Sequence, residues 1–155
     1  MRYWRMQLHP DEPEYATYYT VECLMNSYIG LGFEGADKDL SSIDYNSLET
    51  TPNNIYAFVH DISKDDWILI FHHNAPFALV TELGPYNFIK MNVPEMNIWF
   101  RHFRRFNKEK LSFYYDVFKT GINKHSGIKM TNTFSEASED SETVKLIKEW
   151  IALIL

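Results

Sequence analysis

The sequence contains six histidines, which are the first side chains to consider for chemistry because imidazole binds metals and transfers protons near neutral pH. None of them stands in a His-Glu-x-x-His or comparable spacing that would bring two ligands to one ion. His72 and His73 are adjacent, so in an extended chain their side chains point to opposite faces. We expect polar loop contacts from this pair and no metal site. The six are His9, His60, His72, His73, His102 and His125.

Covalent catalysis has no recognisable signature either. The single cysteine, Cys23, falls on the apolar side of a predicted helix, where a buried, unreactive thiol is the usual outcome. The chain has no Gly-x-Ser-x-Gly elbow, no phosphate-binding loop and no Pro-Asp…Glu-x-Lys nuclease pattern. Its carboxylate pairs, Asp37/Asp39 and Asp65/Asp66, occur in turns that explain them without chemistry. We predict a non-enzymatic domain that needs no cofactor.

Basic residues are concentrated in one stretch of a chain that is acidic overall. The 155 residues carry 15 Lys and Arg against 21 Asp and Glu, a formal charge of −6, yet residues 97–130 hold eight basic side chains and two acidic ones. Because polyanion binding depends on a local field, this stretch predicts a phosphate-binding surface. A solvated charge cluster without a ligand is the alternative. The candidate phosphate-binding residues are Arg101, Arg104, Arg105, Lys108 and Lys110.

Aromatic side chains are abundant, at 16% of the chain, and many of them fall on or beside predicted strands. Most must be buried, because burial is where large rings usually go. Rings beside Arg and Lys are also how proteins hold an unstacked or flipped nucleobase. Individual rings therefore have either a structural or a base-binding interpretation.

Apolar periodicity divides the chain into strands and helices. Residues 34–54 and 123–133 are polar and predict loops, the first with one helical turn around 40–45, and 72–76 predicts a hairpin turn. The predicted strands cover 3–8, 28–33, 67–71, 77–83 and 97–106. The predicted helices cover 17–26, 55–62, 108–119 and, closing the chain, about 141–155.

These elements favour an α+β fold around a curled, mostly antiparallel sheet. The length and an apolar fraction of 45% suit one domain over residues 1–155. A single cysteine excludes an intrachain disulfide. No run approaches the roughly 18–20 apolar residues of a membrane span, and the amino terminus lacks an apolar signal region. We expect a soluble, cytoplasmic protein.

The order of short motifs resembles a known group of domains. Tyr3-Trp4-Arg5 opens the first strand, Tyr28-Ile29-Gly30-Leu31-Gly32-Phe33 forms the second, and Asp39-Leu40 follows. Asp65-Asp66 then precedes the apolar strand at 67–71. This order resembles the EVE-like branch of the PUA superfamily, which also contains the YTH readers. More closely, it is similar to the amino-terminal specificity domains of McrB-type and Mrr-type modification-dependent restriction proteins.

The resemblance implies a β-barrel-like sheet flanked by helices, with a pocket that accepts a flipped, modified base. Two positions depart from the family pattern, since Phe33 replaces Trp and Asp65 replaces a glycine that could adopt positive φ. Core packing is an equal alternative for the rings of Trp4 and Phe33. The positions matched to the base pocket are Trp4, Arg5, Phe33, Asp39, His72, His73 and Asn74.

The leading hypothesis is a non-catalytic DNA-binding domain that gives a modification-dependent restriction system its specificity by flipping and reading a modified base, most simply a methylated one. An AAA+ motor or a nuclease would act from another domain or partner. An RNA-binding module of the same superfamily is one alternative. The other is a protein-interaction domain that docks a partner chain through its aromatic surface, with the apolar end at 150–155 as a further contact.

Overall fold

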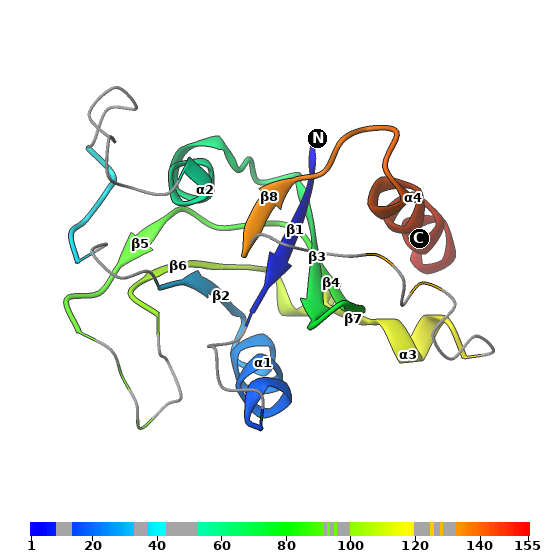
Figure 1. The fold of residues 1–155 in the computed structure, drawn as a ribbon, viewed down its shortest axis with the longest axis horizontal. Helices are drawn as coiled ribbons and strands as arrows, with labels where there is room; N and C mark the ends of the chain where they lie inside the picture. Colours follow the sequence, from blue (N-terminus) through cyan, green and yellow to red (C-terminus); the bar gives the residue numbers. More distant parts are fainter. Residues whose placement is uncertain are drawn as a thin grey trace.

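The protein folds as an α+β structure of two β-sheets with four α-helices in the part of the chain that is described (Figure 1). This confirms the expected fold class. The longest helix is too short to cross a membrane, and no described helix is apolar enough to do so. The computed structural model describes residues 1–8, 14–32, 37–42, 53–91, 93, 95, 100–119, 125, 128 and 133–155.

The first sheet has five strands in the order β7-β4-β3-β1-β8. Its central pair, β1 and β3, is parallel, with Trp4 opposite Ile68, whereas the other neighbours are antiparallel. The sheet is therefore mixed. Its strands are β1 (Tyr3–Gln7), β3 (Trp67–His72), β4 (Ala75–Val80), β7 (Ser112–Phe113) and β8 (Phe134–Glu136).

The second sheet is antiparallel and has β6 (His102–Arg105) between β2 (Tyr28–Leu31) and β5 (Asn87–Phe88). In Figure 1 it lies to the left of the first sheet. The described strands remain two separate sheets and do not close into a barrel.

Helices cover both sides of the first sheet (Figure 1). On one side are α3 (Tyr114–Val117) and α4 (Glu142–Ile154), and the hydroxyl of Ser141 caps α4 by accepting from the Val144 amide at 3.3 Å. The other side meets α1 (Ala16–Met25) and the second sheet. It also meets a helical segment formed by α2 (Asn53–Tyr56) and the π-helical turn η2 (Ala57–Asp61).

Alternation along the central strands divides the core between these two sides. Trp4 and Met6 of β1 face the larger cluster with α1, η2 and the second sheet. Tyr3 faces the smaller cluster with α3 and α4, where it packs with Leu69 and Trp150. Successive side chains of a strand point to opposite faces, and both faces here are covered, so the apolar run of β3 is buried throughout.

One predicted helix is wrong. Residues 108–119 form a short 3-10 turn, η4 (Lys108–Lys110), then strand β7, and only then α3. The cause is long-range pairing, because Ser112 and Phe113 join the edge of β4 opposite Leu79 and Ala78. Tertiary hydrogen bonding overrides the helical periodicity of this segment.

Other boundaries differ less. The predicted hairpin turn at 72–76 is shorter, because β4 begins at Ala75, and the predicted strand at 97–106 is observed as β6 over 102–105. The short strands β5 and β8 were not anticipated. Residues 97–99, most of the predicted loops and Phe33 lie outside the described residues.

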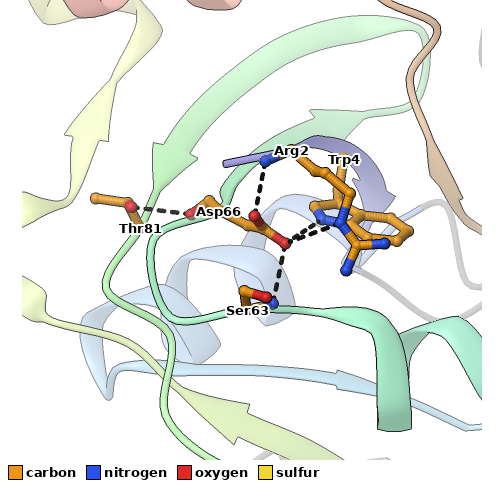
Figure 2. Close-up of polar contacts among 5 residues, drawn as sticks. All are labelled: Arg2, Trp4, Ser63, Asp66 and Thr81. Atoms are coloured by element: carbon orange, nitrogen blue, oxygen red, sulfur yellow. Dashed lines mark hydrogen bonds and ion pairs between the residues drawn. The ribbon is translucent and has the colours of Figure 1, made fainter.

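A fully buried carboxylate, that of Asp66, joins the start of β1 to the turn before β3 (Figure 2). Its Oδ1 accepts from the Arg2 amide at 2.7 Å, and its Oδ2 accepts from Trp4 Nε1 and the Ser63 amide at 2.9 Å each. The Thr81 hydroxyl donates to the Asp66 carbonyl at 2.9 Å. Three N–H donors therefore depend on one side chain for their partners.

The preceding residue, Asp65, is exposed and stands where the resemblance leads us to expect a glycine. The described non-glycine residues with positive φ are Ser27, His73 and Glu82. Asp65 is not among them, so this turn does not need the left-handed conformation that glycine favours.

We expect Asp66→Asn to lower the free energy of unfolding by at least about 2 kcal/mol, because the amide group would turn an N–H toward one of the buried donors. Asp65→Asn is the matched control and should stay within about 0.5 kcal/mol of wild type, as an exposed substitution. Urea unfolding followed by tryptophan fluorescence measures both. Equal stabilities for the two variants would contradict the role given to Asp66.

Candidate nucleic-acid interface

Trp4 and Arg5, both matched to the base pocket, point to opposite faces of β1. Trp4 is 1% exposed, stacks on Phe134 with ring centroids 5.1 Å apart, and donates to Asp66. Arg5 lies on the other face and donates to the Ser135 hydroxyl at 3.2 Å. The two side chains do not line one cavity, and the ring of Trp4 belongs to the core.

The hairpin tip of β3 and β4 holds three more of the matched residues, His72, His73 and Asn74. His72 Nε2 and the Thr17 hydroxyl hydrogen-bond each other at 2.6 Å, which ties the tip to α1. His72 lies four residues beyond Ile68, the strand partner of Trp4. At about 3.3 Å a residue, the tip is roughly 13 Å from Trp4 along the strand.

Asp39 lies on a third part of the surface. It is exposed, and the Ser41 amide donates to its Oδ1 at 2.9 Å, which holds the pKa of the carboxyl below its usual value. The Leu40 amide donates to the Tyr86 hydroxyl at 3.2 Å, and that hydroxyl hydrogen-bonds Nδ1 of buried His102 at 2.8 Å. These bonds fix residues 37–42 to β6.

Arg104 is buried and fully engaged with backbone carbonyls. Its Nε donates to the Phe58 carbonyl at 2.8 Å, and its two terminal nitrogens donate to the Gly84 and Val59 carbonyls at 2.8 and 2.7 Å. Burial lowers the pKa of this guanidinium. Arg104 thus attaches β6 to η2, so we leave it out of the candidate phosphate surface.

Arg101 is also committed to protein partners. Its guanidinium forms an ion pair with Asp37 at 3.0 Å, donates to the Ile89 carbonyl at 3.2 Å, and lies 5.2 Å from the centre of the Phe88 ring. The carboxylate of Asp37 already neutralises this charge.

Three of the predicted phosphate-binding residues are exposed, and all three lie at or just beyond the carboxyl end of β6. Arg105 ends the strand, and Lys108 and Lys110 lie on η4 with Glu109 between them. None of the three cations has an ion-pair partner among the residues that the structure describes. They form the basic end of β6.

Next to this basic end is a small apolar pocket on one face of the second sheet. Strand pairing puts Tyr28 opposite Arg105 and Gly30 opposite Phe103, so these residues share a face, which we call the outer face. The pocket has a volume of about 110 Å³. Its lining residues are Tyr28, Ile89, Val93, Phe100 and Phe103.

The rings of this pocket are held in fixed positions. Tyr28 and Phe103 meet edge to face with centroids 5.5 Å apart, and the Arg105 guanidinium lies 4.9 Å from the centre of the Tyr28 ring. Phe100 packs so closely on Gly30 that a Cβ there would come within 2.0 Å of the ring. A cation at the rim of a ring-lined pocket is suited to a planar ligand that carries a negative charge.

A second, open depression of about 310 Å³ lies at the start of β1 and is less suitable for a polyanion. Two glutamates, Glu136 and Glu139, line it together with Met1, Arg2 and Tyr3. Glu139 forms an ion pair with Lys148. Carboxylates at this site would repel phosphate groups.

Two observations concern metal ligands and the thiol in the described part of the chain. No set of three or more His, Cys, Asp or Glu side chains is arranged to hold a metal ion there. Cys23 is buried, and desolvation raises the pKa of its thiol to about 12, as expected for an unreactive cysteine.

The residues that line this pocket thus differ from those that the resemblance matched to a base pocket. The ring pair Tyr28 and Phe103 was not assigned to the pocket, although alternation along β6 places Phe103 and Arg105 on one face. Ile89 and Val93 lie outside regular paired strands, so periodicity gave no sign of them. Comparisons with family models, with curated proteins and with solved structures find no match for this chain.

The two neighbouring arginines of β6 are expected to behave differently when substituted. Arg104→Gln should lower the free energy of unfolding by at least about 2 kcal/mol, because buried carbonyls lose their donors. Arg105→Gln should change it by less than about 0.5 kcal/mol, because the side chain is exposed. Urea titrations of both variants measure the difference, and a stable Arg104→Gln protein would disprove the structural role.

Gly30→Ala is expected to lower stability by about 1–3 kcal/mol, since the added methyl forces the Phe100 ring out of position. Gly84→Ala is the control, because its Cβ would meet its nearest atom at 3.3 Å and needs only a small adjustment. Thermal unfolding of both variants gives the comparison. A loss of stability in Gly84→Ala as large as that in Gly30→Ala would contradict the close packing of Phe100 on Gly30.

Proposed function

We propose that this protein is a non-catalytic nucleic-acid recognition domain that reads a modified, most simply methylated, base in the outer-face pocket. The observation that carries the proposal is a ring-sized aromatic pocket with Arg105 on its rim and two lysines just beyond it. Modification-dependent restriction is the proposed setting, with an AAA+ motor or nuclease acting from another domain or partner. The curled, barrel-like architecture of EVE-like domains is part of the same proposal.

The size of the pocket suits one ring. Pockets that enclose a whole small molecule measure roughly 300–1,000 Å³, whereas an apolar cavity of about 150 Å³ is enough for benzene. At about 110 Å³, which is less than the benzene cavity, this pocket can take part of a single base and leaves the sugar and phosphate outside. The phosphate would then lie near the basic end of β6.

In this proposal, stacking supplies the affinity for a base, and the methyl group supplies the preference for a modified base over an unmodified one. Base–aromatic stacking contributes about 1–3 kcal/mol per base, while extruding a base from a duplex costs a few kcal/mol. Burying one added methyl group contributes about 0.8 kcal/mol, or roughly fourfold in affinity. The lining is almost entirely apolar, which favours an alkyl substituent on the bound ring over a polar one.

Fluorescence anisotropy with labelled oligonucleotides tests the proposal. The series compares DNA with and without N6-methyladenine or 5-methylcytosine, and matched RNA, at two salt concentrations. We expect binding that weakens with salt and a several-fold preference for the methylated strand. The RNA samples decide between DNA and RNA as the partner, and absence of binding to every nucleic acid would refute the proposal.

Phe103→Leu should weaken this binding about tenfold while the fold is retained, because leucine fills space but offers no ring face. Tyr18→Leu is the control, since Tyr18 is a half-exposed ring on α1 that does not line the pocket. Equal affinities of the two variants would show that the outer face is not the site.

A further inference from the structure

We infer that the outer-face pocket takes a base that is already unpaired, in a single strand or at a mismatch, and does not extract one from an intact duplex. This inference rests on the proposed function and narrows its ligand. Three features of the second sheet carry it: the number of available cations, the position of nearby carboxylates, and the single ring that the pocket admits.

Few cations are available for phosphates. Exposed Lys90 lies at the Arg101 end of the sheet, where Arg101 donates to its carbonyl. Of the candidate phosphate-binding residues, Arg104 donates to carbonyls and Arg101 is paired with Asp37, which leaves Arg105, Lys108 and Lys110. All three lie at one end of β6, and together they can neutralise about three phosphates, whereas proteins that grip duplex DNA make roughly six to ten such contacts. The basic end of β6 can therefore follow one strand over a short distance.

Carboxylates occupy the region where a second strand would lie. Phosphates of the two strands face each other across grooves roughly 6–12 Å wide. Arg101 lies four residues before Arg105, or roughly 13 Å away at the spacing of a strand. The exposed carboxylates of Asp37 and Asp39 lie at the Arg101 end. Asp39 is exposed and ionised at neutral pH, and the Ser41 amide holds the pKa of its carboxyl below the usual value. Because Asp37 is paired with Arg101, a second row of phosphates would meet the negative charge of Asp39 there.

The pocket itself offers one stacking position. Tyr28 and Phe103 form its partly exposed ring surface, while Phe100 is fully buried beneath. A single stacked base at best offsets the cost of extrusion from a duplex, which leaves little net affinity. A base that is already unpaired avoids this cost and is bound more tightly.

The test compares three labelled DNA ligands of one sequence with a central methylated base: the single strand, the full duplex, and the duplex with a mismatch opposite that base. We expect the single strand and the mismatched duplex to bind at least about tenfold more tightly than the full duplex. The logarithm of the binding constant of the single strand should fall with the logarithm of salt concentration with a slope of about −2, for three phosphate contacts.

Asp39→Asn tests the effect of the carboxylate separately from the effects of cation number and of stacking. It keeps the acceptor for the Ser41 amide and removes the charge, so duplex binding should improve several-fold while single-strand binding changes little. Glu142→Gln on α4 is the matched control and should change neither. Full-duplex binding as tight as that of the single strand would overturn the inference and leave the proposed function standing. Absence of binding to all three ligands would overturn both.

Discussion

The buried carboxylate of Asp66 is the interaction on which the arrangement of the two sheets depends. It fixes the start of β1 through the Arg2 amide and the indole of Trp4, and so sets the parallel pairing of β1 with β3. The Trp4 ring then stacks on Phe134, and Phe134 meets Phe58 edge to face at 5.5 Å. The buried charge is tolerated because the carboxylate accepts from three N–H donors and lies 3.7 Å from the Arg2 guanidinium.

The same chain of contacts reaches the candidate site through Arg104. The carbonyls of Phe58 and Val59, on the π-helical turn η2, accept from its guanidinium, which also lies 5.8 Å from the Phe58 ring. Arg104 holds one face of β6 against the core, and Phe103 and Arg105 must then point away from it. The core side of β6 thus determines the direction of the side chains that would meet a ligand.

Local patterns in the sequence predicted the elements with strong periodicity, and long-range contacts decided the rest. The apolar run at 67–71 became the buried strand β3, and the periodic segment predicted to close the chain became α4. The strand at 112–113 was missed because only its pairing with β4 makes it a strand. For the site, alternation along β6 put Phe103 and Arg105 on one face, but nothing local shows that two of the carbonyl partners of Arg104 lie 45 and 46 residues away in η2. The charge of Arg104 therefore suggested phosphate binding, whereas in the structure its guanidinium donates to backbone carbonyls.

The outer face of the second sheet is the surface that we propose binds nucleic acid. The most direct test of this proposal is to add a short methylated single strand to isotope-labelled protein and to follow the NMR signals of backbone amides and aromatic rings. We predict that the largest shifts occur at Tyr28, Gly30, Phe103 and Arg105, while the signals of α4 stay unchanged. Shifts confined to α1 and the tip of β3 and β4, with none on the outer face, would contradict it.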